Sequence, residues 1–204
     1  MSNIKGFKEL EPNTLVRELI QYIEKELPSF PTSQEFKDNW IKKNEDKYSS
    51  VFVIFMTNQC KSNFYFKSEN PQKGSHTIDI GVYKGSVLIF TIEAKILPTP
   101  KPRIEHEYVY GKGAGIQRFK ECKHGLDNSN NPLPESGMLA YIKDNDYDYY
   151  HKKVNQWILD ATWDKSEQLE KISFNAIGKL KSKHKRISDS SEFILHHFWI
   201  KVPK

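Results

Sequence analysis

Three charged residues lie within two apolar segments of this sequence, in a pattern suited to holding a divalent metal ion. Asp79 interrupts the apolar segment 77–82, and Glu93 and Lys95 end the apolar segment 87–95. Near-continuous apolar residues around each charge predict strands that are buried on both faces. An ionised group in such a strand is costly unless it is paired or bound to a metal. The position of these charges therefore indicates a chemical role.

Strand geometry predicts how the three side chains meet. Glu93 and Lys95 share one face because side chains alternate along a strand, and a hairpin turn over 83–86 would bring Asp79 close to Glu93. Two converging carboxylates suit Mg²⁺, with Mn²⁺ as a substitute. The Lys95 ammonium would then act on the attacking water or on the transition-state charge. The alternative is a salt-bridged group at the end of a strand.

The spacing resembles that of a known family. Asp79, thirteen intervening residues and then Glu93-Ala94-Lys95 resemble the PD-(D/E)XK phosphodiesterase superfamily, which has the restriction-endonuclease-like fold. The resemblance implies an α/β fold with a central mixed sheet flanked by helices. It also implies that Asp79 and Glu93 are metal ligands and that Lys95 is the catalytic lysine. One departure is Ile78, which stands where the family name has proline.

The same resemblance implies two further site residues. The family often adds an upstream acidic ligand, and we favour Glu69 over Glu18 and Glu35 because it opens the segment that leads into Asp79. A helix after the Glu-x-Lys strand often contributes a polar residue, frequently glutamine, and Gln117 resembles it. The tyrosine that some branches carry four residues later is replaced here by Glu121.

Basic residues indicate an anionic partner. The net charge is +5 and the pI is about 9.0, which favours nucleic acid, with DNA expected before RNA. The densest basic segment is 179–186, which could lie along a phosphate backbone or form a solvated loop. The candidate phosphate contacts are Arg118, Lys120, Lys181, Lys183, Lys185 and Arg186.

Length and composition predict one globular domain. The chain has 204 residues, which we divide into a helical part, 1–48, and a catalytic core, 50–204. No apolar run is long enough for a membrane span, and no secretory signal pattern opens the sequence. Two widely separated cysteines, Cys60 and Cys122, predict no disulfide framework. We therefore expect a cytoplasmic protein that does not act at a membrane.

The pattern of apolar residues predicts alternating helices and strands. Helices are expected over 13–27, 33–47, from about 113, and over 147–163. Strands are expected over 51–57 (with a buried helix as the alternative), 63–67, 137–142 and 193–202, and a loop over 69–76. One of Asp144, Asp146 and Asp148 should cap the helix that follows, because the glycine of a calcium loop is missing. One of His196 and His197 should be a hydrogen-bonded core residue.

These observations favour a Mg²⁺-dependent nuclease, and the family resemblance implies a role in restriction, repair or phage defence. A second interpretation is a catalytically silent subunit that binds nucleic acid or scaffolds a larger complex. A third is an unrelated α/β domain whose Glu93 and Lys95 form a surface salt bridge. The sequence leaves open whether a partner subunit or a second copy of the chain takes part.

Overall fold

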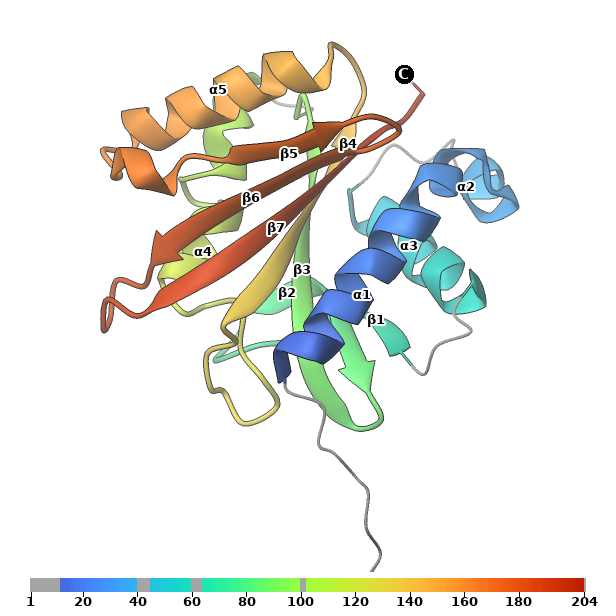
Figure 1. Cartoon of the computed structure of the whole chain (residues 1–204), viewed down its shortest axis with the longest axis horizontal. Coiled ribbons are helices and arrows are strands. Elements are labelled where there is room, and N and C mark those ends of the chain that lie inside the picture. The colour runs from blue at the N-terminus through green and yellow to red at the C-terminus, as the bar shows by residue number, and fades with distance from the viewer. Residues whose placement is uncertain (1–11, 40–44, 60–63, 100–101, 204) are drawn as a thin grey trace, which may run out of the picture.

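The structure is a computed structural model that describes residues 12–39, 45–59, 64–99 and 102–203. Its centre is a seven-stranded mixed sheet with helices on both faces (Figure 1). The α/β class and the helix-flanked mixed sheet predicted from the sequence are therefore confirmed. None of the described helices is long and apolar enough to cross a membrane.

The strand order in the sheet is β1-β2-β3-β4-β7-β6-β5. The first three strands form an antiparallel meander, β4 and β7 run parallel to β3, and β6 and β5 are antiparallel at the far edge. The bounds are β1 Phe64–Pro71, β2 Thr77–Lys84, β3 Val87–Leu97, β4 Glu135–Ile142, β5 Glu170–Phe174, β6 Gly178–Lys185 and β7 Glu192–Lys201.

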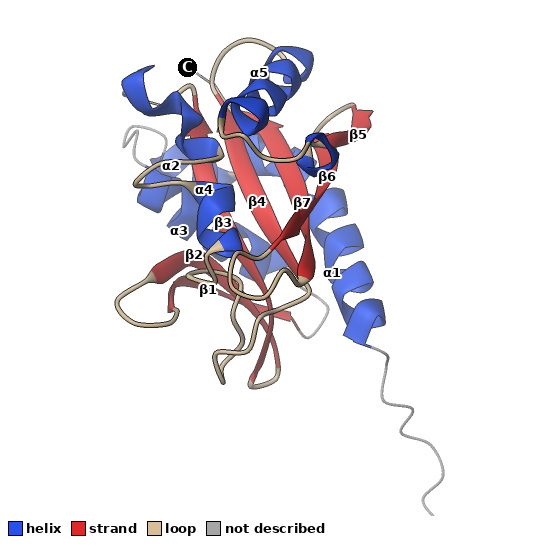
Figure 2. Cartoon of the chain, turned by 90° about the vertical axis from the view of Figure 1, so that its left-hand side faces the viewer, coloured by secondary structure: helices blue, strands red, loops and turns tan. Residues whose placement is uncertain are grey.

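Helices cover both faces of the sheet (Figures 1 and 2). One face carries α1 (Pro12–Glu26), the 3-10 helix η1 (Leu27–Thr32), α2 (Gln34–Asn39) and α3 (Glu45–Gln59). The other carries η2 (Pro102–Tyr108), α4 (Gly115–Lys120) and α5 (Tyr147–Asp160), followed by the short η3 (Lys165–Glu167). Each face has its own apolar core, and side-chain alternation assigns strand residues to one core or the other.

The predicted strand at 51–57 is wrong, because these residues belong to helix α3. Their buried members, with Tyr48, are Val51, Phe52, Phe55 and Met56, which follow the spacing of one helix face. Packing of that face overrides the strand preference of β-branched and aromatic residues. The predicted helix 33–47 is shorter, since α2 ends at Asn39, and Trp40 and Ile41 lie outside the described residues.

The other predicted elements are mostly confirmed. The β2–β3 hairpin, β4, α5 and β7 all form, and Asp146 caps α5 by accepting a hydrogen bond from the Tyr149 N–H at 2.7 Å. His197 is the buried histidine of its pair. Two segments differ from the prediction. The loop predicted from residue 69 starts later because β1 runs to Pro71, and most of the basic segment 179–186 is strand β6 rather than a loop.

Candidate functional site

The β2–β3 hairpin brings Asp79 beside the Glu93–Lys95 segment. Ile80 pairs with Ile92, so Asp79 and Glu93 occupy the next positions of the two strands, where regular pairing ends. At that point Asp79 Oδ2 accepts a hydrogen bond from the Ala94 N–H at 2.6 Å. The Asp79 side chain thus takes the place of a main-chain partner for β3.

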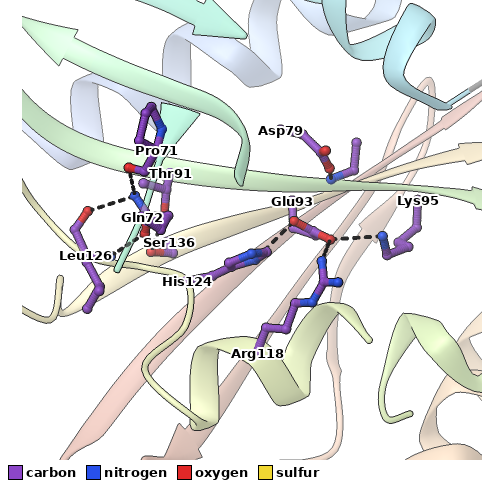
Figure 3. Close-up of polar contacts among 11 residues, drawn as sticks. Pro71, Gln72, Asp79, Thr91, Glu93, Lys95, Arg118, His124, Leu126 and Ser136 are labelled. Carbon is purple, nitrogen blue, oxygen red and sulfur yellow. Dashed lines mark hydrogen bonds and ion pairs between the residues drawn. The ribbon is translucent and has the colours of Figure 1, made fainter. Parts of the chain in front are cut away.

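A rotation of the β2 backbone explains this direction of Asp79. Ile80 lies in the core under α1–α3, whereas Ile78 lies in the core under α4 and α5. Asp79, between them, points toward the main chain of β3. Figure 3 shows the Asp79 carboxylate on one side of the β3 ribbon, while Glu93 extends on the other side.

Glu93 is the centre of a buried charge cluster. Its side chain is 2% exposed, and Lys95 Nζ lies 2.9 Å and Arg118 Nη1 3.4 Å from Glu93 Oε1. His124 Nδ1 lies 3.1 Å from the other oxygen, Oε2. We call Glu93, Lys95, Arg118 and His124 the Glu93 cluster (Figure 3).

Electrostatics keep Glu93 ionised despite its burial. Burial alone would raise its pKa, but the Lys95 ammonium and the His124 imidazole lower the pKa of the Glu93 carboxyl to about 2. The hydrogen bonding of the cluster is nevertheless incomplete. Among the described residues, Glu93 Oε2 and both ring nitrogens of His124 are buried without a hydrogen-bond partner, because the 3.1 Å approach lacks hydrogen-bond geometry.

The donor set fits a hard divalent ion in part. Carboxylate oxygens are the ligands that Mg²⁺ prefers, and Glu93 Oε2 is a buried oxygen whose hydrogen-bonding capacity is unused. Within the described ranges, however, no group of three or more histidine, cysteine, aspartate and glutamate side chains is arranged to hold a metal. Because the two carboxylates lie on opposite sides of the β3 ribbon, a Mg²⁺ bound to both would require Asp79 to turn toward Glu93, with water and substrate oxygens as the other ligands.

The residues predicted to complete the metal site lie elsewhere. Glu18 is on α1 and Glu35 on α2, the helices that cover the opposite face from Glu93, and Glu35 accepts a hydrogen bond from Asn58. Glu69 is exposed near the end of β1, with a φ of 50°. Gln117 is used within its own loop, where its side chain accepts from the Gly111 N–H and donates to Glu121.

The predicted phosphate contacts divide into three groups. Arg118 joins the Glu93 cluster and its side chain remains 29% exposed. Lys120 is buried against Glu167 and lies over the Trp163 ring, and Arg186 is buried over the Phe193 ring with its guanidinium donating to the Leu133 carbonyl. In this structure, Lys120 and Arg186 are buried and therefore cannot contact the phosphates of a bound nucleic acid.

The lysines of β6, of which Lys181, Lys183 and Lys185 are the predicted contacts, form the third group. Lys179, Lys181, Lys183 and Lys185 alternate with the buried residues Leu180, Ser182 and His184, so they lie on the face of the sheet that α1 partly covers. Lys179 pairs with Glu24 of α1, and Lys183 pairs with Glu192 of β7. These lysines therefore lie on the opposite face of the sheet from the Glu93 side chain.

A second buried polar group lies on the Glu93 face, across β4. It is a chain of hydrogen bonds that joins β6, β7, η2 and η3, which we call the His184 chain. The chain starts with Trp199 Nε1, which lies 2.9 Å from Tyr108 Oη, and Tyr108 Oη lies 2.8 Å from His197 Nδ1. Ser182 Oγ lies 2.7 Å from both His197 Nε2 and His184 Nε2. The chain ends at Glu167 Oε2, which lies 2.7 Å from His184 Nδ1 and is also paired to Lys120.

His124 was not predicted as a site residue. It reaches Glu93 from the loop after α4, where Gly125 has a φ of 76° and packs against Phe119. The sequence signal was limited to a lone histidine beside a glycine, since the path of that loop depends on tertiary packing. Comparisons with protein-family models, with curated proteins and with solved structures find no match to this chain.

Proposed function

We propose that this protein is a Mg²⁺-dependent nuclease that hydrolyses phosphodiester bonds in nucleic acid. The observation that carries the proposal is the meeting of Asp79 with the Glu93–Lys95 segment on adjacent strands, beside a cation from α4. Two carboxylates and a lysine in this arrangement are suited to metal-assisted hydrolysis.

The architecture supports the finer assignment to a restriction-endonuclease-like fold. The predicted mixed sheet flanked by helices is present, Asp79 is on β2, and Glu93 and Lys95 are on the neighbouring strand β3. Helix α4 follows directly after β3 and η2, and it contributes a polar side chain to the site. That side chain is Arg118 rather than the expected Gln117.

Asp79 and Glu93 are the residues that would hold the ion. When bound there, Mg²⁺ would polarise a phosphate oxygen and lower the pKa of a coordinated water. The adjacent cations keep Glu93 deprotonated at neutral pH despite its burial, so its carboxylate is ready to act as a ligand without losing a proton.

Lys95 and Arg118 have different parts in this proposal. The Lys95 ammonium is almost completely buried beside Glu93, a position from which it can stabilise charge that develops in the transition state. The more exposed Arg118 can exchange Glu93 for a substrate phosphate, which a guanidinium binds in a bidentate manner.

One observation favours the catalytically silent alternative. Glu93 Oε1 already receives two cations and the side chain is 2% exposed, so the carboxylate is saturated on that side. In a silent subunit these ion pairs would be permanent, and the fold would serve only to bind nucleic acid or a partner.

A cleavage panel tests the proposal. The purified protein is incubated with single-stranded and double-stranded DNA and RNA in the presence of Mg²⁺ or Mn²⁺. Lys95→Met removes the ammonium while keeping much of the buried volume, and should lower kcat by roughly 100-fold or more. Its affinity for the same substrates in EDTA should stay close to that of the wild type, because a transition-state interaction contributes little to ground-state binding.

Lys67→Met is the matched control, since Lys67 is an exposed lysine of the same sheet. It should cleave like the wild type. Full activity in Lys95→Met would overturn the catalytic assignment. A wild type that binds nucleic acid but cuts none of the substrates would instead support the silent alternative.

A further inference from the structure

A pocket of about 600 Å³ lies beside the Glu93 cluster. It opens between the turn that joins β1 to β2 and the loop that joins α4 to β4, with Ser188 of the β6–β7 loop on its rim. Pockets of this size commonly accommodate a small organic molecule or a single building block of a polymer.

The walls of the pocket are held in place by hydrogen bonds, of which those between Gln72 and Leu126 are buried. The Gln72 side chain is 7% exposed, its Oε1 accepts from the Leu126 N–H at 2.9 Å, and its Nε2 donates to the Leu126 carbonyl at 3.4 Å. Asp127 then accepts from the N–H groups of Ser129 and Asn131, each at 2.8 Å. These contacts join the two loops across the sequence and preform the pocket.

One imidazole separates the pocket from Glu93. His76 lines the pocket, and its ring centroid lies 6.5 Å from that of His124, whose Nδ1 is 3.1 Å from Glu93 Oε2. In Figure 3, the bonded pair Gln72 and Leu126 lies on one side of His124 and Glu93 on the other. A polymer that places one group at Glu93 could therefore place the adjacent group in the pocket.

The lining combines cationic and apolar surfaces. Lys73 and Lys123 supply positive charge, with Lys123 also paired to Glu121 at 2.5 Å. Pro132 and the His76 ring supply apolar and aromatic surface, whereas Leu126 lines the pocket but is only 1% exposed, and the Glu121 carboxylate also lines it. Lysines suit a phosphate, and a flat apolar or aromatic surface suits a nucleobase, which stacks on it.

We propose that this pocket binds one unpaired nucleotide next to the phosphate held at the Glu93 cluster. The proposal rests on the proposed nuclease function for the position of that phosphate. A base that enters the pocket cannot remain in a duplex, so the preferred substrate is a single strand, a frayed end or a flipped nucleotide. The charges on Lys73 and Lys123 hold its phosphate, while His76 and Pro132 contact the base.

The first test blocks the pocket without touching the buried site. Ser188→Trp places a bulky side chain on the rim at an exposed position, and Ile187→Trp places the same group on the neighbouring residue, which is 65% exposed and outside the pocket. Anisotropy in EDTA measures binding of labelled DNA and RNA decamers, single-stranded or in blunt duplexes. We expect Ser188→Trp to weaken single-strand binding at least tenfold and Ile187→Trp to leave it unchanged.

The second test removes charge. Lys73→Ala combined with Lys123→Ala should weaken single-strand binding and flatten its salt dependence. Without these two phosphate contacts, binding releases fewer counterions from the nucleic acid. Lys67→Ala combined with Lys165→Ala removes the same charge from exposed positions that do not line the pocket. That control should have a smaller effect on both quantities.

The outcomes separate this inference from the proposed function. No binding of any single strand by the wild type, or equal effects of the pocket variants and their controls, would overturn the inference. Pocket-dependent binding by a protein that cleaves nothing would retain the inference and remove the nuclease proposal. Cleavage that depends on Lys95 but is insensitive to Ser188→Trp would retain the nuclease and remove the pocket assignment.

Discussion

Two buried polar groups lie on the same face of the sheet, and they differ in how completely their hydrogen bonds are made. In the His184 chain, no buried side-chain nitrogen or oxygen of its described members lacks a partner. In the Glu93 cluster, one carboxylate oxygen and two imidazole nitrogens lack one. Both groups carry a carboxylate, a lysine and at least one histidine, so composition alone does not distinguish them.

The His184 chain has a single consistent direction of donation. Glu167, whose pKa is lowered although burial opposes this, only accepts, so His184 Nδ1 must donate to it. Burial also lowers the pKa of His184 and His197, which makes both rings neutral. His184 Nε2 therefore accepts from the Ser182 hydroxyl, and Ser182 accepts from His197 Nε2–H.

The remaining part of the chain follows from this direction. His197 Nδ1 accepts from the Tyr108 hydroxyl, which accepts in turn from Trp199 Nε1–H. A fully satisfied network fixes the positions of its members and has no capacity left for a ligand. The incomplete Glu93 cluster keeps such capacity at the place where chemistry is proposed.

Helix α4 links the two groups. Arg118 reaches Glu93 and Lys120 reaches Glu167, although the two residues are separated by only one position. Their exposures differ, since the Arg118 side chain is 29% exposed and that of Lys120 is 7% exposed. The two side chains therefore have different roles: Lys120 anchors the helix, and Arg118 remains available to a substrate.

Glu167→Leu should produce the largest loss of stability. The change leaves Lys120 and His184 Nδ1 buried without their acceptor, which costs about 3–5 kcal/mol for a broken buried pair. Adding Lys120→Met should recover part of this loss, because no unpaired buried charge remains. Urea unfolding of the single and double variants measures both values.

Glu192→Leu is the control, since its ion pair with Lys183 is about half exposed and should contribute far less to stability than the buried pair of Glu167. If Glu167→Leu were as mild as this control, the His184 chain would not anchor the fold, and the contrast between the two groups would fail.

Glu93→Gln should show a pH-dependent loss of stability. The carboxyl pKa falls from 4.5 to about 2 on folding, so ionised Glu93 stabilises the fold above pH 4.5 and this contribution disappears as the pH falls toward 2. The difference between wild type and Glu93→Gln is expected to be on the order of 3 kcal/mol at pH 7. It should narrow between pH 4.5 and pH 2.

The His184 chain should respond to acid earlier than Glu93. Neutral buried histidines must be charged on unfolding below pH 6.5, because their pKa values are lowered in the fold. The loss of stability between pH 6.5 and 4.5 should therefore persist in Glu93→Gln. Chemical denaturation across this range measures both windows, and a single shared window would show that the two groups are not independent.

The hairpin and its charged residues could be predicted because their determinants are local. Apolar residues around Asp79 and before Glu93 predict two buried strands, and a short polar turn predicts their pairing. The end of β2–β3 pairing at Asp79 could not be predicted, because it depends on which core receives Ile78. The Asp79 side chain consequently accepts a hydrogen bond from the Ala94 N–H, which the spacing of residues in the sequence did not predict.

The basic segment shows where local reasoning fails. Its alternation of lysines with Leu180, Ser182 and His184 is a strand pattern, but two of the inward residues are polar. Their partners, Glu167 and His197, come from η3 and β7, so burial becomes favourable only after the sheet has formed. Charge density therefore indicated either a segment along a phosphate backbone or a solvated loop, whereas tertiary hydrogen bonds stabilise a strand with buried polar residues.

Ser182→Ala should cost about 1–3 kcal/mol, a smaller effect than the loss of a buried charge. The change leaves the His184 acceptor and the His197 donor unpaired in a buried position. Ser136→Ala is the matched control, because Ser136 is a similarly buried serine on β4 whose hydroxyl has one hydrogen-bond partner among the described residues, Thr91 at 3.1 Å. Ser136→Ala should lower the free energy of unfolding by less than Ser182→Ala. Equal losses for the two serines would mean that the His184 chain stabilises the fold no more than a single hydrogen bond does.

Mg²⁺ should have the smallest effect, and it acts on the incomplete group. An ion that binds only the folded state at several times its Kd adds on the order of 1 kcal/mol, which corresponds to a rise in Tm of about 2–4 °C for a chain of this size. Asp79→Asn removes one of the two carboxylates that would hold the ion, and should abolish most of this rise. Ser182→Ala, in the saturated chain, should retain it in full. Thermal unfolding with and without Mg²⁺ measures the rise in Tm for each protein. A rise in Asp79→Asn equal to that of the wild type would mean that the ion binds elsewhere and that the Glu93 cluster does not hold it.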